Sequence, residues 1–218
     1  MASSCADVPV QPLPLTGQET GIDRGIEALA TRGDGARILT PSYYRKAEAY
    51  LRRCQRRVAR RKKGSHRRRK AVALLAKAHQ HIRHQRRDFH HREARKLVQA
   101  YDVIAHEDLQ VANLVRNHHL AKSISDAGWS ALLAILAFKA ASAGKRVPAV
   151  DPAYTSQTCS ACGVVVQKGL SVRWHSCPDC GTSLHRDHNV ARNRERLGQS
   201  RRGDVAKAAS KNRESVEH

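Results

Sequence analysis

The sequence predicts an α/β protein in which a small sheet is joined to a basic pair of helices and a four-cysteine zinc ribbon. Three observations support this prediction. Short apolar runs flank a Gly-Asp-Gly turn within residues 19–40. Helical apolar periodicity and many arginines follow over residues 42–100. Two Cys-x-x-Cys pairs lie within residues 159–180.

The first part of the chain predicts a strand hairpin. Residues 1–18 are proline-rich and irregular, as expected of a linker or of the remnant of a further domain. From Glu19, short apolar runs are separated by the turn at Gly33-Asp-Gly35, which predicts adjacent antiparallel strands. These strands open a core that we expect to cover residues 19–153.

The next part predicts an antiparallel helical hairpin over residues 42–100. Ser42 is the expected N-cap of its first helix, and Gly64-Ser65 is the expected break between the two helices. The residues that recur at helical spacing in the first helix are Ala47, Leu51, Cys54 and Val58. Those on one side of the second helix are Val72, Leu75, Ala78, Ile82 and Phe89.

The remaining elements are short. Tyr101–Ala105 predicts a strand, and it leads into His106-Glu107-Asp108. Trp129–Ala143 predicts an Ala/Leu-rich helix and Arg146–Val150 a last strand of the core. The zinc ribbon is expected over residues 154–185 and a final helix over 186–198. The polar tail, residues 199–218, is expected to be disordered.

The charge of the chain indicates a polyanionic partner. Its formal net charge is +21. Residues 41–100 alone hold 21 Lys and Arg against three acids, whereas a solvated helix normally mixes both signs. Such a stripe binds phosphates through counterion release. A membrane-surface helix is the alternative, but helix pairing explains the apolar faces better. The candidate phosphate contacts are Arg52, Arg56, Arg60, Arg67, Arg83 and Arg87.

No targeting or membrane segment is expected. The N-terminus lacks the basic and apolar regions of a signal peptide. The longest apolar run, Ala131–Ala143, contains Lys139 and is too short to span a bilayer. We therefore expect a cytoplasmic protein with no membrane partner; its oligomeric state cannot be read from the sequence.

Four cysteines form two matched pairs, Cys159-Ser-Ala-Cys162 and Cys177-Pro-Asp-Cys180, with 14 residues between the pairs. This spacing predicts a tetrahedral structural Zn2+ site, and the glycine after each pair lets the backbone curl around the metal. Disulfides are the alternative, disfavoured because cytosolic thiols stay reduced. Cys5 and Cys54 belong to neither pair and are expected to be free thiols.

Three acids fall at the ends of predicted elements: Asp23, Glu107 and Asp187. Carboxylates from separate elements can converge on hard ions such as Mg2+ or Mn2+. Two such ions activate an attacking water and stabilise the leaving oxygen of a phosphodiester. Glu107 is preferred to Asp108 because consecutive strand residues face opposite sides of a sheet. Taken singly, each acid is more often ordinary turn or strand-end chemistry, so this pattern leaves a zinc-containing nucleic-acid binder with a candidate metal site.

Several motifs together resemble the TnpB/OrfB proteins of insertion sequences. Gly21-Ile-Asp-Arg-Gly-Ile26 resembles their first RuvC motif, and Ile104-Ala-His-Glu-Asp-Leu109 resembles the second. Asp151-Pro-Ala-Tyr-Thr-Ser-Gln-Thr-Cys-Ser-Ala-Cys-Gly163 is similar to that family's approach to its zinc ribbon. Arg186-Asp-His-Asn-Val-Ala-Arg-Asn193 resembles the third motif. The resemblance covers about residues 19–197.

The resemblance implies an RNase H-like (RuvC) core and an RNA-guided DNA endonuclease, often labelled a transposase. It implies that Asp23, Glu107 and Asp187 are catalytic ligands of Mg2+ or Mn2+ and that the four paired cysteines hold Zn2+. The implied partners are DNA and a guide RNA transcribed from the transposon end, with base pairing reading most of the target.

The chain departs from the family at its start. Family members carry a sizeable N-terminal region, whereas only 20 residues precede Gly21 here. The alternative function is therefore a truncated, catalytically idle nucleic-acid-binding remnant. A zinc-ribbon module of a translation or transcription factor is a third interpretation, but it does not account for Asp23 and Glu107.

Overall fold

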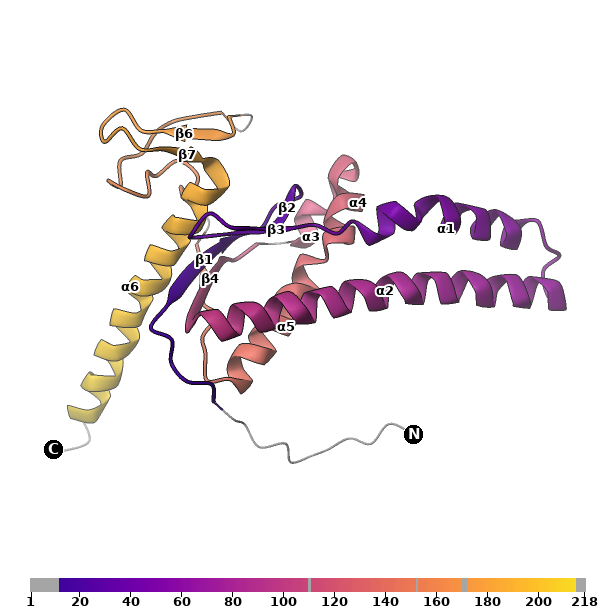
Figure 1. Ribbon diagram of the computed structural model, residues 1–218, viewed down its shortest axis with the longest axis horizontal. Helices are drawn as coiled ribbons and strands as arrows, with labels where there is room; N and C mark the ends of the chain where they lie inside the picture. The colour runs from indigo at the N-terminus through magenta and orange to yellow at the C-terminus, as the bar shows by residue number, and fades with distance from the viewer. Residues whose placement is uncertain (1–11, 110, 152, 170–171, 215–218) are drawn as a thin grey trace.

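The computed structural model describes residues 12–109, 111–151, 153–169 and 172–214 (Figure 1). Its main sheet has five strands in the order β3-β2-β1-β4-β5. The strands are β1 (Glu19–Asp23), β2 (Ala28–Arg32), β3 (Arg37–Leu39), β4 (Val103–Glu107) and β5 (Ala149–Val150). β1 to β3 pair antiparallel, while β4 and β5 run parallel to β1. The predicted α/β class and its antiparallel first strands are confirmed.

One face of the sheet carries the last helix, α6 (Arg186–Glu214), which crosses β1 at close range (Figure 1). Gly21 makes this approach possible, because a Cβ at that position would lie only 2.0 Å from the carbonyl oxygen of Ala191. Gly198 has the same role against β4, where its Cβ would lie 2.6 Å from that of Ala105. The helix that bears Asp187 therefore lies directly on the central strands.

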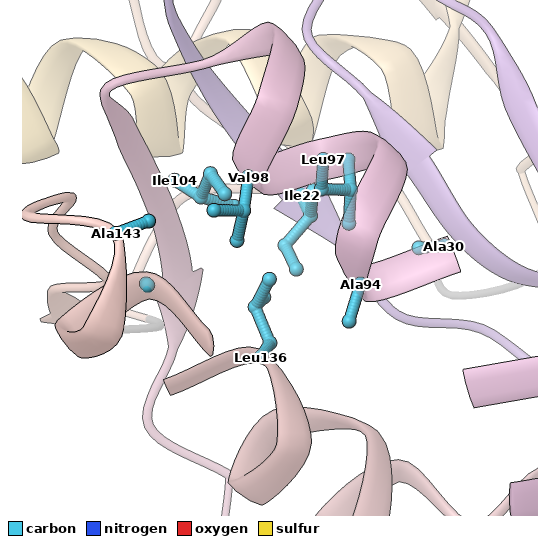
Figure 2. Close-up of a cluster of buried hydrophobic side chains, with 9 residues drawn as sticks. Ile22, Ala30, Ala94, Leu97, Val98, Ile104, Leu136 and Ala143 are labelled. Atoms are coloured by element: carbon cyan, nitrogen blue, oxygen red, sulfur yellow. The ribbon is translucent and has the colours of Figure 1, made fainter. Parts of the chain in front are cut away.

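The other face of the sheet holds the main apolar core, against α2 (His66–Ala100) and α5 (Trp129–Ser142). Figure 2 shows Ile22 and Ile104 from the sheet meeting Leu97 and Val98 of α2 and Leu136 of α5, all buried. Side chains alternate along a strand, so the neighbours of these isoleucines point to the α6 face. Apolar burial on one face thus directs the strand-end acids to the other.

The helical hairpin consists of α1 (Tyr43–Ala59) packed along the first half of α2, and it extends away from the sheet (Figure 1). Leu51 and Cys54 of α1 are buried, as the helical periodicity predicted. On α2, Ile82 is buried, but Val72 is 46% exposed. The neighbouring Ala71 is buried instead.

Ser42 does not cap α1 with its side chain. Its backbone is left-handed, with φ 53°, and its hydroxyl makes no capping bond. The carboxylate of Asp126, in α4 (His118–Ala127), instead accepts hydrogen bonds from the Tyr44 and Arg45 amides at 2.9 and 3.1 Å. No element had been expected at α4 or at α3 (Val111–Leu114). A side chain remote in sequence thus replaces the local cap.

Replacing Asp126 with alanine is expected to lower the free energy of unfolding by about 1–2 kcal/mol. The change leaves two amides in the first turn of α1 without their acceptor, and loss of an N-cap costs this order of energy. Urea denaturation measures the effect. Ser42→Ala is the matched control and should change stability by less than about 0.5 kcal/mol; equal effects of the two variants would contradict the role of Asp126.

One apolar segment bears on the expectation that the chain has no membrane-spanning helix. By length and composition alone, His118–Ser142 could cross a membrane. This is weak evidence, because Gly128 (φ 66°) separates α4 from α5, and Ile124, Leu132 and Leu136 are buried in the protein core.

The last helix is longer than expected. It continues to Glu214, where a disordered tail had been expected from residue 199. Alanine, lysine and arginine are frequent there and favour a helix; residues 215–218 lie outside the described part.

Candidate functional site

The three candidate acids lie along one cavity of about 460 Å³. Asp23 ends β1, Glu107 ends β4 and Asp187 stands in the first turn of α6. Because β1 and β4 are parallel, their carboxyl ends meet at one edge of the sheet, where ligands bind in open α/β sheets. Ile22 pairs with His106 in the register of these strands, so Asp23 and Glu107 follow side by side. Asp108 is exposed and does not line the cavity.

An arginine that the sequence analysis missed bridges two of the acids. Arg194 of α6 is 3% exposed. It donates to Asp23 Oδ1 at 2.6 Å and to Glu107 Oε2 at 2.5 Å. It also donates to the Ile22 carbonyl oxygen at 2.9 Å. Its position seven residues after Asp187 puts both side chains on one helical face, and this spacing was the available signal.

The electrostatics of the site depend on burial and on this arginine. Burial raises the pKa of Asp23 to about 6. Arg194 opposes the shift, and the carboxylates of Glu107 and Asp187 add to it. A second buried arginine, Arg24, donates to the Glu107 carbonyl oxygen at 2.7 Å, and burial lowers its pKa. Carboxylates and guanidinium groups are therefore packed together beside the cavity.

The side of the cavity formed by the ribbon is basic. Lys168 and Arg173 of the ribbon line the cavity, and so does Arg186 of α6, whose Nε lies 3.6 Å from Asp187 Oδ1. The Lys168 amino group lies 2.6 Å from His175 Nδ1, and His175 is fully buried in the ribbon. Burial lowers the pKa of Lys168. A nucleic-acid backbone that enters the cavity would thus meet both carboxylates and cationic side chains.

The four paired cysteines form a cluster that could hold a metal ion, with their sulfur atoms all within 4.8 Å of one another. Sγ–Sγ distances are 3.7 Å for Cys159–Cys180 and 3.5 Å for Cys162–Cys177. These lengths exclude disulfides and approach the edge of about 3.8 Å that a tetrahedral Zn–S site requires. The two glycines after the pairs adopt positive φ, as predicted. Of the other thiols, Cys54 is buried and free, and Cys5 lies outside the described residues.

Two asparagines of α6 join the ribbon to the acid site. The Asn189 side chain accepts from the Ser160 amide at 2.9 Å and donates to the Thr158 carbonyl oxygen at 2.7 Å. Asn193 donates to the same carbonyl oxygen at 2.7 Å. Both asparagines are buried. The first cysteine pair is therefore tied to the helix whose first turn holds Asp187, through residues to which the sequence analysis assigned no role.

The ribbon also determines where α6 begins. Its strands β6 (Trp174–Ser176) and β7 (Ser183–His185) pair antiparallel, and α6 follows directly. His185 Nδ1 accepts from the Asp187 amide at 3.3 Å, which is the contact of a helix-entry residue. The position of Asp187 thus depends on the end of the ribbon as well as on the sheet.

Arginines of the hairpin gather near its far end. One cavity there is lined by Arg53, Arg56, Arg57, Arg60 and Arg61. A second is lined by Arg57, Arg61, Arg67, Lys70, Ala71 and Leu74. Of the six predicted phosphate contacts, Arg56, Arg60 and Arg67 belong to this group. Arg52 is exposed and paired with Glu48, while Arg83 and Arg87 are exposed farther along α2.

Comparison with known proteins places these features in a family. Residues 3–118 match a family described as "Probable transposase" (OrfB of IS605), which covers more than half of the chain. Residues 129–194 match the "Cas12f1-like, TNB domain". The two matches together include all three acids and all four paired cysteines.

Relatives match over most of this chain but over about half of their own length. A Streptomyces pristinaespiralis protein named "Putative RNA-guided DNA endonuclease" is 40% identical over 87% of this chain and 47% of its own. A protein of Escherichia coli K12 with the same designation, InsQ, is 32% identical over 84% of this chain and 49% of its own. Mimivirus relatives that are 28% identical are named TnpB-like.

Solved structures share the fold. A CRISPR-Cas12f ternary complex aligns with a TM-score of 0.61 and 19% identity, over 87% of this chain and 40% of that protein. A complex of Cas12f1 with guide RNA and target DNA aligns with a TM-score of 0.57 and 16% identity. Family match, relatives and fold agree, and this chain therefore belongs to the TnpB/OrfB family of insertion-sequence proteins.

Proposed function

We propose that this chain forms the catalytic part of an RNA-guided, metal-dependent DNA endonuclease with a RuvC-like core. The observation that carries the proposal is the convergence of Asp23, Glu107 and Asp187 on one cavity beside basic side chains. The names of the relatives point to the same activity. The chain spans only about half of the length of those relatives. The nuclease activity that their names give is therefore proposed for this chain by comparison.

The donor set fits the proposed metal. Three carboxylates on separate elements supply the oxygen ligands that Mg2+ and Mn2+ prefer. When bound there, such ions activate a water and stabilise the leaving oxygen of a phosphodiester. Lys168 and Arg173, which line the same cavity, would contact the phosphates and orient the scissile bond toward the acids.

We propose Zn2+ as the ion of the cysteine cluster. Four thiolates at tetrahedral spacing are the donor set of a structural zinc site. Its role here is positional, since the ribbon holds the start of α6 through Asn189 and Asn193.

DNA and a guide RNA from the transposon end are the proposed partners. In RNA-guided nucleases, base pairing reads the target while the protein holds the backbone through charge and shape. The arginines at the far end of the hairpin have the charge and the spacing for this task. Two of them, Arg57 and Arg61, line both cavities there and are the strongest candidates for phosphate contacts.

The double substitution Arg57→Ala and Arg61→Ala is expected to weaken nucleic-acid binding and to reduce the slope of log K against log salt by about 2, because each lost phosphate contact removes about one unit. Filter binding from 50 to 200 mM salt measures the slope. The matched control is Arg37→Ala with Arg92→Ala, since each of these arginines already pairs with an acid and neither is a candidate phosphate contact. A slope unchanged by the first pair would refute the proposed contact.

A second candidate function is nucleic-acid binding without cleavage. Arg194 favours it, because this arginine already neutralises Asp23 and Glu107. Incubating the zinc-loaded protein and guide RNA with target plasmid, with and without Mg2+ or Mn2+, separates the two candidates. Nicked or linear product that requires the metal supports the nuclease. Salt-sensitive binding with no metal-dependent product supports the binding protein.

A further inference from the structure

Arg194 lies in the acid site, yet nothing in the proposed chemistry uses it. Its guanidinium group spans the two carboxylates that end β1 and β4, within 2.6 Å of each. The side chain is 3% exposed, and its Nε has no hydrogen-bond partner among the described residues. Burying a guanidinium group with one N–H donor unsatisfied costs free energy, so other interactions of Arg194 must offset that cost.

The two carboxylates provide those interactions. Asp23 and Glu107 are 13% and 10% exposed at the side chain, and both are acceptors that require a cation nearby. Arg194 gives each of them one charge-assisted hydrogen bond, from Nη1 to Asp23 and from Nη2 to Glu107. The oxygens it contacts, Asp23 Oδ1 and Glu107 Oε2, belong to the same groups that a divalent ion would bind.

We propose that Arg194 is a positioning residue that acts as a tethered cation. It holds Asp23 and Glu107 together in the metal-free protein, and a divalent ion must displace it to bind. The inference rests on the proposed metal site and adds that Arg194 competes with the metal ion for Asp23 and Glu107. Because Arg194 projects from the helix whose first turn holds Asp187, its release is coupled to the third acid through α6.

Competition has a measurable consequence. Replacing Arg194 with methionine keeps an unbranched side chain of similar length and removes the cation. The variant is expected to bind Mn2+ at least about tenfold more tightly, because one positive charge no longer opposes the ion at short range. Metal-free, the variant should melt at a lower temperature than the unchanged chain, and Mn2+ should raise its melting temperature by more.

The test is a Mn2+ titration of the zinc-loaded full chain, followed by electron paramagnetic resonance of free Mn2+. Arg192→Met is the matched control, since Arg192 is an exposed arginine on the same helix and its loss changes the net charge equally. Asp187→Asn is added in the Arg194→Met background to locate the gained binding. Arg194→Lys keeps the charge but has one nitrogen in place of the two that contact the carboxylates, so its affinity should lie between those of the unchanged chain and the methionine variant.

The outcomes are distinct. Tighter Mn2+ binding in Arg194→Met, lost again with Asp187→Asn and absent from Arg192→Met, supports the inference. Equal or weaker binding in Arg194→Met overturns it while leaving the nuclease proposal intact. Absence of Mn2+ binding from every variant overturns both. If Arg194→Met does not fold, Arg194→Lys decides, and an affinity no tighter than that of the unchanged chain overturns the inference.

Discussion

Replacing Asp187 with asparagine is expected to abolish metal-dependent DNA cleavage while leaving the fold intact. The asparagine keeps the size of the side chain in the first turn of α6 but removes its charge and a metal-binding oxygen. Substitution of residues that merely support a metal ligand costs about 10- to 100-fold, so loss of a ligand should exceed 100-fold. Single-turnover plasmid cleavage in Mg2+ measures the effect.

Asp108→Asn is the matched control for this experiment. Asp108 follows Glu107 directly, yet it is exposed and outside the cavity. Its replacement removes the same charge a short distance away and should leave the cleavage rate within about twofold. Cleavage that survives Asp187→Asn would refute the proposed role of this acid or reveal a contaminating nuclease.

Replacing Cys177 with alanine, or removing the metal with a strong chelator, is expected to unfold the ribbon. Binding of Zn2+ to a small four-ligand module contributes about 10–16 kcal/mol of apparent free energy, more than a ribbon of this size gains from its core. Unfolding would free the Ser160 amide and the Thr158 carbonyl from Asn189, and the start of α6 would lose its support. Cleavage should therefore fall together with ribbon structure.

Hydrogen exchange followed by mass spectrometry separates this effect from global unfolding. Amides in the ribbon and the first turn of α6 should lose protection, while β1, β4 and α2 keep theirs. Cys54→Ala is the control, because Cys54 is a buried free thiol in α1, far from the ribbon in sequence. Unchanged exchange in the ribbon after zinc removal would show that the metal is not structural.

The starts of the two hairpin helices show where the local sequence predicts a helix cap and where it does not. Gly64 and Ser65 were predicted to lie between the two helices of the hairpin. Ser65 indeed caps α2, because its side chain accepts a hydrogen bond from the Arg68 amide. The same reasoning failed at Ser42, because its cap comes from Asp126, 84 positions away in the sequence. A local signal predicts a local bond only when no distant side chain competes for the same amides.

The sequence by itself determined the α/β class, the four-cysteine cluster and the candidate acids. Each depends on spacing along the chain: alternation in strands, paired cysteines, and acids at strand ends. Only the tertiary structure decided that Arg194 lies between Asp23 and Glu107, and that Asn189 and Asn193 connect the ribbon to α6. These contacts join residues far apart in sequence. The Arg194 contacts are possible because Gly21 lets α6 lie against β1, an approach between two segments far apart in the chain.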